Sequence, residues 1–286
     1  MNIGWIGVGK MGLPICQRFK AAGHHICVLA RSETASQKMR DMTLNPVPSI
    51  VELCENADIV FSSISNDAAL LEILDGVATL KPGVTYIDIS TVSPAASAEV
   101  AKRLSKAKIN YLRSPVSGST AMARAGMLTA VVSGPKSKFN ELAAIFEVFA
   151  KKAFHVGESE EARYLKLVLN SMVAATSALL GEALALGQKG GLSNAAMLDV
   201  INQSAVASPL IGYKTDMIVS GDYSPAATLD MLKKDLDLFL AAGVENDVAM
   251  PINSAVKKIY DSAANHGLGE RDFFVLVQQA GKANIS

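Results

Sequence analysis

The stretch that decides the fold is Gly7-Val8-Gly9-Lys10-Met11-Gly12, which directly follows the apolar segment Ile3-Gly4-Trp5-Ile6. Its G-x-G-x-x-G spacing is common by itself, but here it follows a predicted strand and opens a predicted helix. The first glycine permits a tight turn, the second lets the backbone approach a diphosphate, and the third allows close helix–strand packing. The helix N-terminus then faces the phosphates. The stretch predicts a dinucleotide-binding turn made by Gly7, Gly9, Lys10, Met11 and Gly12, and the alternative is an ordinary glycine-rich turn.

Outward from this turn, short β-like runs alternate with amphipathic helical runs through the first half of the chain. Gly23 stands where a glycine would end the first helix. The alternation predicts an α/β domain of the Rossmann type, with parallel strands joined by helical crossovers. The predicted strands are 3–7, 26–30, 58–62, 85–88, 109–112, 129–133 and 153–156, and the main predicted helices are 10–22, 67–74, 93–105 and 138–150.

After Gly157 the β pattern fades and residues 160–187 form one long helical pattern, about 42 Å at ~1.5 Å per residue. Further helices are predicted at 195–203, 228–242, 250–265 and 271–279. We therefore expect residues 1–157 to form a dinucleotide-binding Rossmann domain and residues 158–286 to form an all-α domain for substrate binding and dimerisation, joined by the long helix. A second subunit would cover the apolar side of that helix, which predicts a homodimer or dimer-based oligomer.

The bulk composition excludes several classes. The 286 residues carry 27 basic and 27 acidic side chains, so no net field attracts nucleic acid or an anionic membrane. Three cysteines without paired spacing favour a reducing compartment, the cytoplasm, and the four histidines show no metal-ligand spacing. No signal peptide is expected. The apolar run 165–187 contains Lys166, Asn170 and Glu182, which would be costly in lipid, so a buried helix is expected there.

The residues after the second predicted strand bear on the choice of cofactor. An acid there would bind the ribose 2′-hydroxyl of NAD, whereas an arginine suits the 2′-phosphate of NADP. The chain has Ala30, Arg31 and Ser32 at this point. Arg31 would pair with the phosphate and Ser32 would donate to it, which favours NADP (NADPH) over NAD. The alternative is a surface arginine with Glu33 as the ribose ligand.

Four further motifs follow in order along nearly the whole chain. They are Asp88-Ile89-Ser90-Thr91-Val92-Ser93-Pro94, Pro115-Val116-Ser117-Gly118-Ser119, Lys166-Leu167-Val168-Leu169-Asn170 and Lys234-Asp235-Leu236. Together with the glycine turn they resemble the β-hydroxyacid dehydrogenases, which include 3-hydroxyisobutyrate dehydrogenase, tartronate semialdehyde reductase and the glyoxylate/succinic semialdehyde reductases. The resemblance implies hydride transfer between NADPH and a small 3-hydroxy acid or semialdehyde.

The resemblance also implies roles for individual residues. Lys166 would be the proton donor and acceptor, and Asn170 would orient the substrate. Ser117, Gly118 and Ser119 would hold the substrate carboxylate. Residues expected at the cofactor, besides the glycine turn, are Arg31, Ser32, Ser65, Thr91 and Lys234.

Apart from the resemblance, the chemistry of these residues permits both a functional explanation and a simpler structural one. Lys166 and Asn170 are four apart and share a helix face, and a buried lysine beside another cation would have a lowered pKa. The alternative is a lysine on the helix surface, with Arg163 as an ordinary neighbour. Thr91 would otherwise cap the helix 93–105, Ser117-Gly118 would be a plain turn, and Lys234 would be a solvated charge beside Lys233.

The chain departs from the family pattern at two places. Arg113-Ser114 stands where the family has Asp-Ala before Pro-Val-Ser-Gly, and Ser119 replaces a glycine. Residues 158–165 lack the glycines that the family has before its lysine. Arg113 would add positive charge near the substrate loop or face solvent. Two alternatives stay open: an imine reductase of the same superfamily, which usually lacks the lysine, and a non-catalytic NADP-binding scaffold or sensor.

Overall fold

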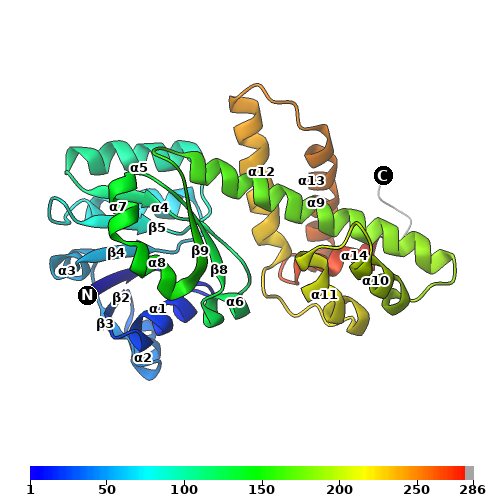
Figure 1. The fold of residues 1–286 in the computed structure, drawn as a ribbon, viewed down its shortest axis with the longest axis horizontal. Helices are drawn as coiled ribbons and strands as arrows, with labels where there is room; N and C mark the ends of the chain where they lie inside the picture. The colour runs from blue at the N-terminus through cyan, green and yellow to red at the C-terminus, as the bar shows by residue number, and fades with distance from the viewer. Residues whose placement is uncertain (281–286) are drawn as a thin grey trace. The chain divides into compact units, whose positions relative to one another are not determined.

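The computed structural model describes residues 1–280. By its internal contacts the chain divides into two compact units, residues 1–166 and the part from residue 167 onward. Figure 1 shows the first unit as strands surrounded by helices and the second as helices only. The predicted combination of a Rossmann-type domain with an all-α region is therefore confirmed. The last six residues of the predicted second domain, 281–286, lie outside the described residues.

Within residues 1–280 the first unit contains a nine-stranded sheet in the order β3-β2-β1-β4-β5-β6-β8-β7, with β9 paired to β8. The prediction of parallel pairing is correct from β3 through β6. It is wrong at β8, which runs antiparallel to β6 and β7. The strands are β1 (Asn2–Ile6), β2 (His25–Leu29), β3 (Asn45–Val47), β4 (Ile59–Ser62), β5 (Thr85–Asp88), β6 (Asn110–Arg113), β7 (Val116–Ser117), β8 (Leu128–Ser133) and β9 (Ala150–Gly157).

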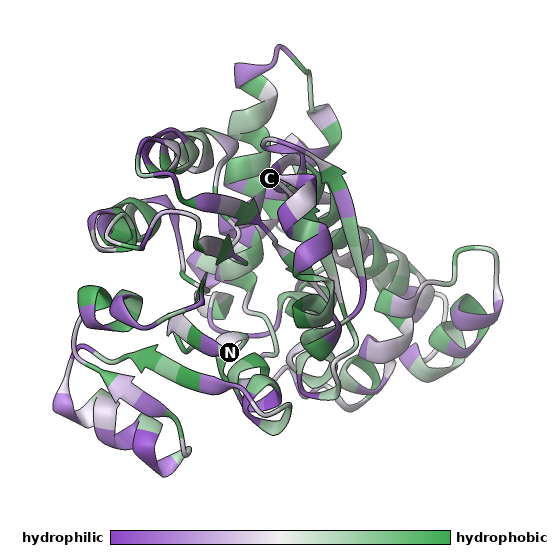
Figure 2. Cartoon of the chain, turned by 60° about the vertical axis from the view of Figure 1, so that its left-hand side comes forward, coloured by the Kyte–Doolittle hydropathy of each residue, from purple (hydrophilic) through white to green (hydrophobic). Residues whose placement is uncertain are grey.

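Alternating side chains of the central strands build two cores, one on each face of the sheet. Trp5 and Phe61 enter a core with Phe19 of α1, whereas Val60 and Tyr86 enter the other, with helices α3 to α5. Because these strands are buried on both faces, their sequences are continuous apolar runs. The helices instead carry both hydrophobic and hydrophilic residues, as Figure 2 shows. The helices of this unit are α1 (Gly12–Ala21), α2 (Glu33–Asp41), α3 (Ile50–Glu55), α4 (Asp67–Val77), α5 (Pro94–Lys106), α6 (Thr120–Ala125), α7 (Lys136–Glu141) and α8 (Ala143–Phe149).

Short elements escaped the sequence prediction. The strands β3 and β7 and the helices α2, α3, α6 and α11 were not expected, since most of them are too short to show a clear hydrophobic period. The predicted helix 138–150 is in fact two helices, α7 and α8. Gly23 does end the first helix as predicted: its φ is +84° and its N–H bonds to the carbonyl of Lys20.

Helix α9 (Glu161–Lys189) starts in the first unit and continues into the second. Of the described helices it alone is long and apolar enough to cross a membrane by length and composition, and 44% of its most apolar window is buried within the protein. Core helices of soluble proteins meet the same criterion. The remaining elements are α10 (Asn194–Gln203), α11 (Pro209–Ser220), α12 (Leu229–Glu245), α13 (Pro251–Ala263), the kinked turn η1 (Ala264–Leu268), the 3-10 turn η2 (Phe273–Val275) and α14 (Leu276–Gln279).

The second unit has its own core and its own buried ion pair. Leu184, Leu198, Tyr260 and Phe274 are fully buried within this core. Lys214 of α11 donates to Asp272 at 2.5 Å, and both side chains are almost completely buried. Such a pair ties α11 to the start of η2 at a substantial desolvation cost.

Candidate functional site

The glycine turn has the geometry expected of a diphosphate cradle. Gly7 adopts φ +87°, and a Cβ there would collide with the carbonyl oxygen of Ser63. A Cβ on Gly12 would lie 2.7 Å from the carbonyl oxygen of Gly7, whereas one on Gly9 would meet nothing within 4 Å. The first and third glycines are thus required by packing, and the space beside Gly9 is open for a ligand. These residues fit a dinucleotide.

The loop after β2 presents an exposed arginine at the start of α2. Ser32 caps α2 by accepting a hydrogen bond from the N–H of Ala35 at 3.2 Å. Arg31 pairs with Glu72 at 2.7 Å, and both side chains are more than half exposed. Glu33, the alternative ribose ligand, instead pairs with Arg40 at 2.8 Å. An exposed pair such as Arg31–Glu72 contributes little stability, so Arg31 can exchange this partner for a phosphate at little cost.

Two more loops leave the same edge of the sheet, since β1, β4 and β5 are parallel neighbours. Ser65 is exposed in the loop after β4, and Thr91 lies in the loop after β5. Ser93, and not Thr91, caps α5 by accepting from the N–H of Ala96 at 3.0 Å. The capping explanation for Thr91 is therefore wrong. Ligands bind at this edge of open α/β sheets.

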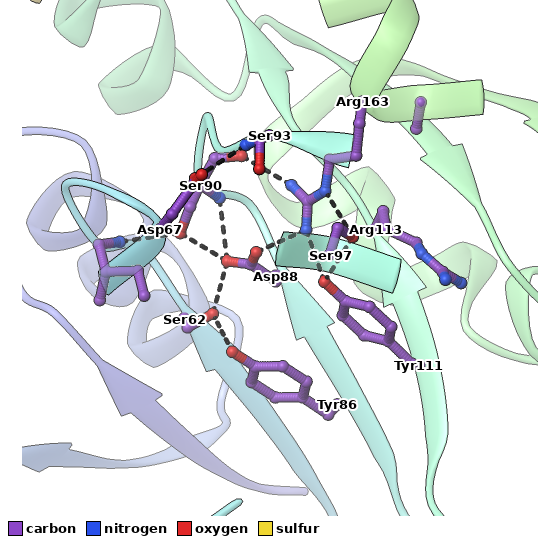
Figure 3. A network of polar contacts seen from close by, with 12 residues as sticks. Ser62, Asp67, Tyr86, Asp88, Ser90, Ser93, Ser97, Tyr111, Arg113 and Arg163 are labelled. Atoms are coloured by element: carbon purple, nitrogen blue, oxygen red, sulfur yellow. Dashed lines mark hydrogen bonds and ion pairs between the residues drawn. The ribbon is translucent and has the colours of Figure 1, made fainter. Parts of the chain in front are cut away.

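A buried polar network holds the loop after β5 (Figure 3). Asp88 Oδ1 accepts from the hydroxyl of Ser62 at 2.6 Å and from the N–H and hydroxyl of Ser90 at 3.1 and 2.5 Å. The Ser90 hydroxyl in turn accepts from the N–H of Ile64 at 2.9 Å. The loops after β4 and β5 are thus bound to each other through Ser90.

Arg163 of α9 completes this network. Its guanidinium donates to Asp88 Oδ2 at 2.5 Å, the Ser90 carbonyl at 2.7 Å, the Tyr111 hydroxyl at 2.7 Å and the Ser97 hydroxyl at 3.1 Å. Only 1% of its surface is exposed, so the alternative that treated Arg163 as an ordinary surface neighbour is wrong. Burial alone would lower the pKa of Arg163, but Tyr111 and Asp88 outweigh it and raise that pKa. Arg163 therefore stays charged.

The two departures from the family pattern meet in space. Arg113, at the end of β6, forms an ion pair with Glu160, which directly precedes α9. The Arg113 side chain is 6% exposed and lies 4.4 Å from the centre of the Tyr111 ring. Arg113 thus does not face solvent, and its charge is matched by a carboxylate. Nothing in the sequence indicated this pair, because Arg113 and Glu160 are 47 residues apart and neither belongs to the family motifs.

The predicted substrate loop lies between β7 and α6. Ser117 ends β7 and pairs with Thr129 of β8, and Gly118 follows at φ +134° with an exposed backbone. The hydroxyl of Ser119 accepts from the N–H of Met122 at 3.3 Å and so caps α6. The conformation of Gly118 is one that other residues rarely adopt, which explains the glycine in this motif.

Lys166 and Asn170 both lie on α9 and both are partly buried. Asn170 donates to Asp235 Oδ2 at 2.6 Å, and Lys234 pairs with Asp235 Oδ1 at 2.8 Å. Asp235, which the sequence argument did not count as a site residue, therefore links the third and fourth motifs of the resemblance. In the described chain no three His, Cys, Asp or Glu side chains are grouped to hold a metal ion.

Comparison with known proteins agrees with these motifs. Residues 2–157 match the NAD binding domain of 6-phosphogluconate dehydrogenase, and residues 161–280 match the NAD-binding region of NADP-dependent 3-hydroxyisobutyrate dehydrogenase. The 2-(hydroxymethyl)glutarate dehydrogenase of Eubacterium barkeri is 30% identical, over 97% of this chain and 94% of that protein.

Solved structures show the same similarity. The 3-hydroxyisobutyrate dehydrogenase of Mycobacterium tuberculosis with L-serine is 25% identical, with a TM-score of 0.88 over 97% of this chain and 98% of that one. Psf3 in complex with NADP+ and 2-OPP is 25% identical, with a TM-score of 0.87 over 97% and 99%. An imine reductase of Streptomyces aurantiacus, at 19% identity and a TM-score of 0.62 over 99% and 100%, shares the fold.

Proposed function

Since the chain belongs to the β-hydroxyacid dehydrogenase family and is an NAD(P)-dependent oxidoreductase, we propose that it interconverts a small carboxylate-bearing carbonyl compound, such as a semialdehyde, and the corresponding hydroxy acid. The nicotinamide, when bound, supplies or accepts the hydride. The imine reductase alternative has weaker support, because those neighbours are less similar. A carboxylate-bearing substrate is supported by two similar proteins, one a dehydrogenase of 2-(hydroxymethyl)glutarate and the other solved with L-serine, since both compounds contain a carboxylate.

In the proposed reaction Lys166 protonates the alkoxide oxygen that forms as the carbonyl is reduced, and it removes the same proton in the oxidation direction. Asn170 orients the reacting oxygen, while Ser117 and the backbone N–H groups near Gly118 and Ser119 hold the carboxylate. The observation that carries this proposal is the bonding of Asn170 and Lys234 to a single carboxylate, Asp235. Partly buried asparagine and lysine side chains held in this way are pre-organised for a ligand.

The experiment is the Lys166→Ala variant, assayed with NADPH against glyoxylate, succinic semialdehyde, tartronate semialdehyde and a cyclic imine. We expect the wild type to reduce one or more of the carbonyl compounds, and the variant to lose at least about a hundredfold in kcat, the lower range for general acid catalysis. NADPH affinity, measured by fluorescence titration, should change little. Turnover retained in the variant, or reduction of the imine alone by the wild type, contradicts the proposal. NADPH binding without any turnover supports a non-catalytic role.

NADP is the proposed cofactor. Arg31 is exposed at the end of β2 with only a solvent-exposed partner, and Ser32 stands beside it at the start of α2. Glu33 is engaged by Arg40, so the acid that would serve NAD has a competing partner. Psf3, with a TM-score of 0.87 to this chain, was solved with NADP+.

A second copy of this chain is the proposed partner, and the cytoplasm, where its three free cysteines would stay reduced, is the proposed compartment. Met172, Leu179 and Leu186 of α9 are 63, 69 and 76% exposed. They are seven residues apart, about two helical turns, and so lie in one stripe. The stripe is symmetric about Leu179, which suits an isologous contact with the same stripe of a second copy.

The Leu179→Glu variant tests this contact. A charge at the centre of the stripe should convert a dimer to a monomer in size-exclusion chromatography with light scattering. The matched control is Val244→Glu, which places the same charge on α12 at a side chain that is 81% exposed, and this variant should remain dimeric. A monomeric wild type, or dimers in both variants, would contradict the proposed contact.

A further inference from the structure

The beginning of α9 is bound to the carboxyl edge of the sheet by charge. Arg163 lies in the first turn of α9 and Glu160 just before it, and each forms a buried ion pair with a strand end, Asp88 of β5 and Arg113 of β6. β5 and β6 are adjacent parallel strands, in which Asp88 and Arg113 occupy paired positions. The helix start is therefore held at two neighbouring points of one edge.

Arg163 also holds the loop that carries Thr91. It donates to the carbonyl of Ser90, the residue directly before Thr91, at 2.7 Å. At its other end the loop is held by Ser93, whose N–H donates to Asp67 at 2.8 Å. Figure 3 shows the guanidinium pointing from α9 into this group of residues. One side chain thus bonds the loop after β5 directly to the first turn of α9.

Lys166 follows Arg163 by three residues on the same helix. This separation corresponds to a rise of about 4.5 Å, and the two side chains leave the helix about 60° apart. Less than one turn of regular helix therefore separates Arg163 from Lys166 along α9. Any shift or rotation of the first turn of α9 is transmitted directly to the lysine.

We propose that Arg163 is a positioning residue that sets the place of Lys166 relative to the Thr91 loop. The proposal rests on the proposed role of Lys166 in proton transfer. The four bonds of Arg163 run to β5, the Thr91 loop, β6 and α5, so they define both the position and the rotation of the guanidinium. A lysine would preserve the charge opposite Asp88 but cannot reproduce this planar set of donors.

The test uses three variants of the full chain. Arg163→Lys keeps a positive charge opposite Asp88 but loses the planar set of guanidinium donors. The double variant Arg163→Met/Asp88→Asn removes both buried charges together, so that no unpaired charge prevents folding. Lys214→Met is the matched control, because it breaks a second almost completely buried ion pair with the same 2.5 Å contact. The measurements are kcat, the NADPH dissociation constant, and the pH midpoint for acetylation of Lys166 by acetic anhydride, which needs no substrate.

In both Arg163 variants we expect kcat to fall by about 10- to 100-fold, the usual effect of an ångström-scale displacement of a reacting group. The acetylation midpoint of Lys166 should move by about half a pH unit or more, and NADPH binding should change by less than about threefold. Lys214→Met should leave the midpoint and kcat near the wild-type values.

The proposal is overturned if Arg163→Lys keeps the wild-type kcat and acetylation midpoint. It is also overturned if the midpoint moves equally in Lys214→Met, since that result would reflect general loosening. Failure of the proposed function looks different: Lys166→Ala would then retain turnover. In that case a shifted acetylation midpoint in Arg163→Lys would still show that Arg163 positions Lys166.

Discussion

The proposed choice of NADP over NAD depends on one exposed side chain, Arg31. The Arg31→Ala variant should bind NADPH about tenfold more weakly, since it loses a charge-assisted contact of roughly 1.5 kcal/mol. NADH affinity should change by less than about twofold, because NADH has no 2′-phosphate. Fluorescence titration of both cofactors measures the difference. Arg40→Ala is the control, since Arg40 is an arginine of similar exposure on the following helix α2, where it pairs with Glu33. Equal loss for both cofactors would count against the NADP assignment.

At the same scale, the sequence identified residue types better than residue partners. The glycine turn was predicted together with the role of each glycine, and the clashes that a Cβ would make at Gly7 and Gly12 agree with those roles. Arg163 and Arg113 were misjudged because their partners, Asp88 and Glu160, lie 75 and 47 residues away. The sequence does not show which opposite charge a side chain pairs with, because the topology of the fold determines which strand ends lie close together.

Helix α11 depends on one buried cation. Lys214 donates to Asp272 at 2.5 Å, and its ammonium lies 4.9 Å from the centre of the Phe273 ring. Lys214→Met should lower the free energy of unfolding by about 3–5 kcal/mol, because Asp272 is left buried without a counter-ion. The measurement is urea denaturation followed by circular dichroism.

The double variant Lys214→Met/Asp272→Asn is the internal control for this prediction. It removes both charges, so it should recover part of the lost stability. A double variant as unstable as the sum of the two single variants would mean that the two side chains act independently.

The elements that the sequence predicted best are long and periodic, as α9 and α5 are. Those it missed are short, such as the two-residue strand β7 and the six-residue helix α3. The antiparallel direction of β8 was also missed, because a strand pattern shows alternation and not direction. Pairing of β8 with β6 and β7 is decided by where the chain turns at Gly118 and Gly126, both at positive φ.

The stability of the whole molecule should decrease steeply at alkaline pH. Burial raises the pKa of Tyr86, Tyr111 and Tyr260, and burial raises that of Tyr213 to about 12. Because the folded pKa values exceed the unfolded value of about 10, the neutral phenols stabilise the folded state fully below pH ~10. Above it, stability falls by about 1.4 kcal/mol per pH unit for each such tyrosine.

We therefore expect these phenols to ionise together with unfolding. Tyrosinate absorbance should rise in a cooperative step that coincides with the loss of circular dichroism. Tyr86→Phe/Tyr111→Phe should make the fall of stability with pH less steep. A smooth titration near pH 10 with the circular dichroism intact would contradict the prediction.

The sequence alone determined the local and repeating features of this protein: the strand–glycine turn–helix unit, the alternation of strands and helices, the long helix, and the order of the motifs that resemble the β-hydroxyacid dehydrogenases. Periodicity and turn chemistry act over a few residues, so they are visible in a single chain. Only the tertiary structure decided which distant polar groups pair, namely Arg163 with Asp88, Arg113 with Glu160, and Asn170 with Asp235. Buried charges must find partners, and the topology of the sheet and helices determines which partners are within reach.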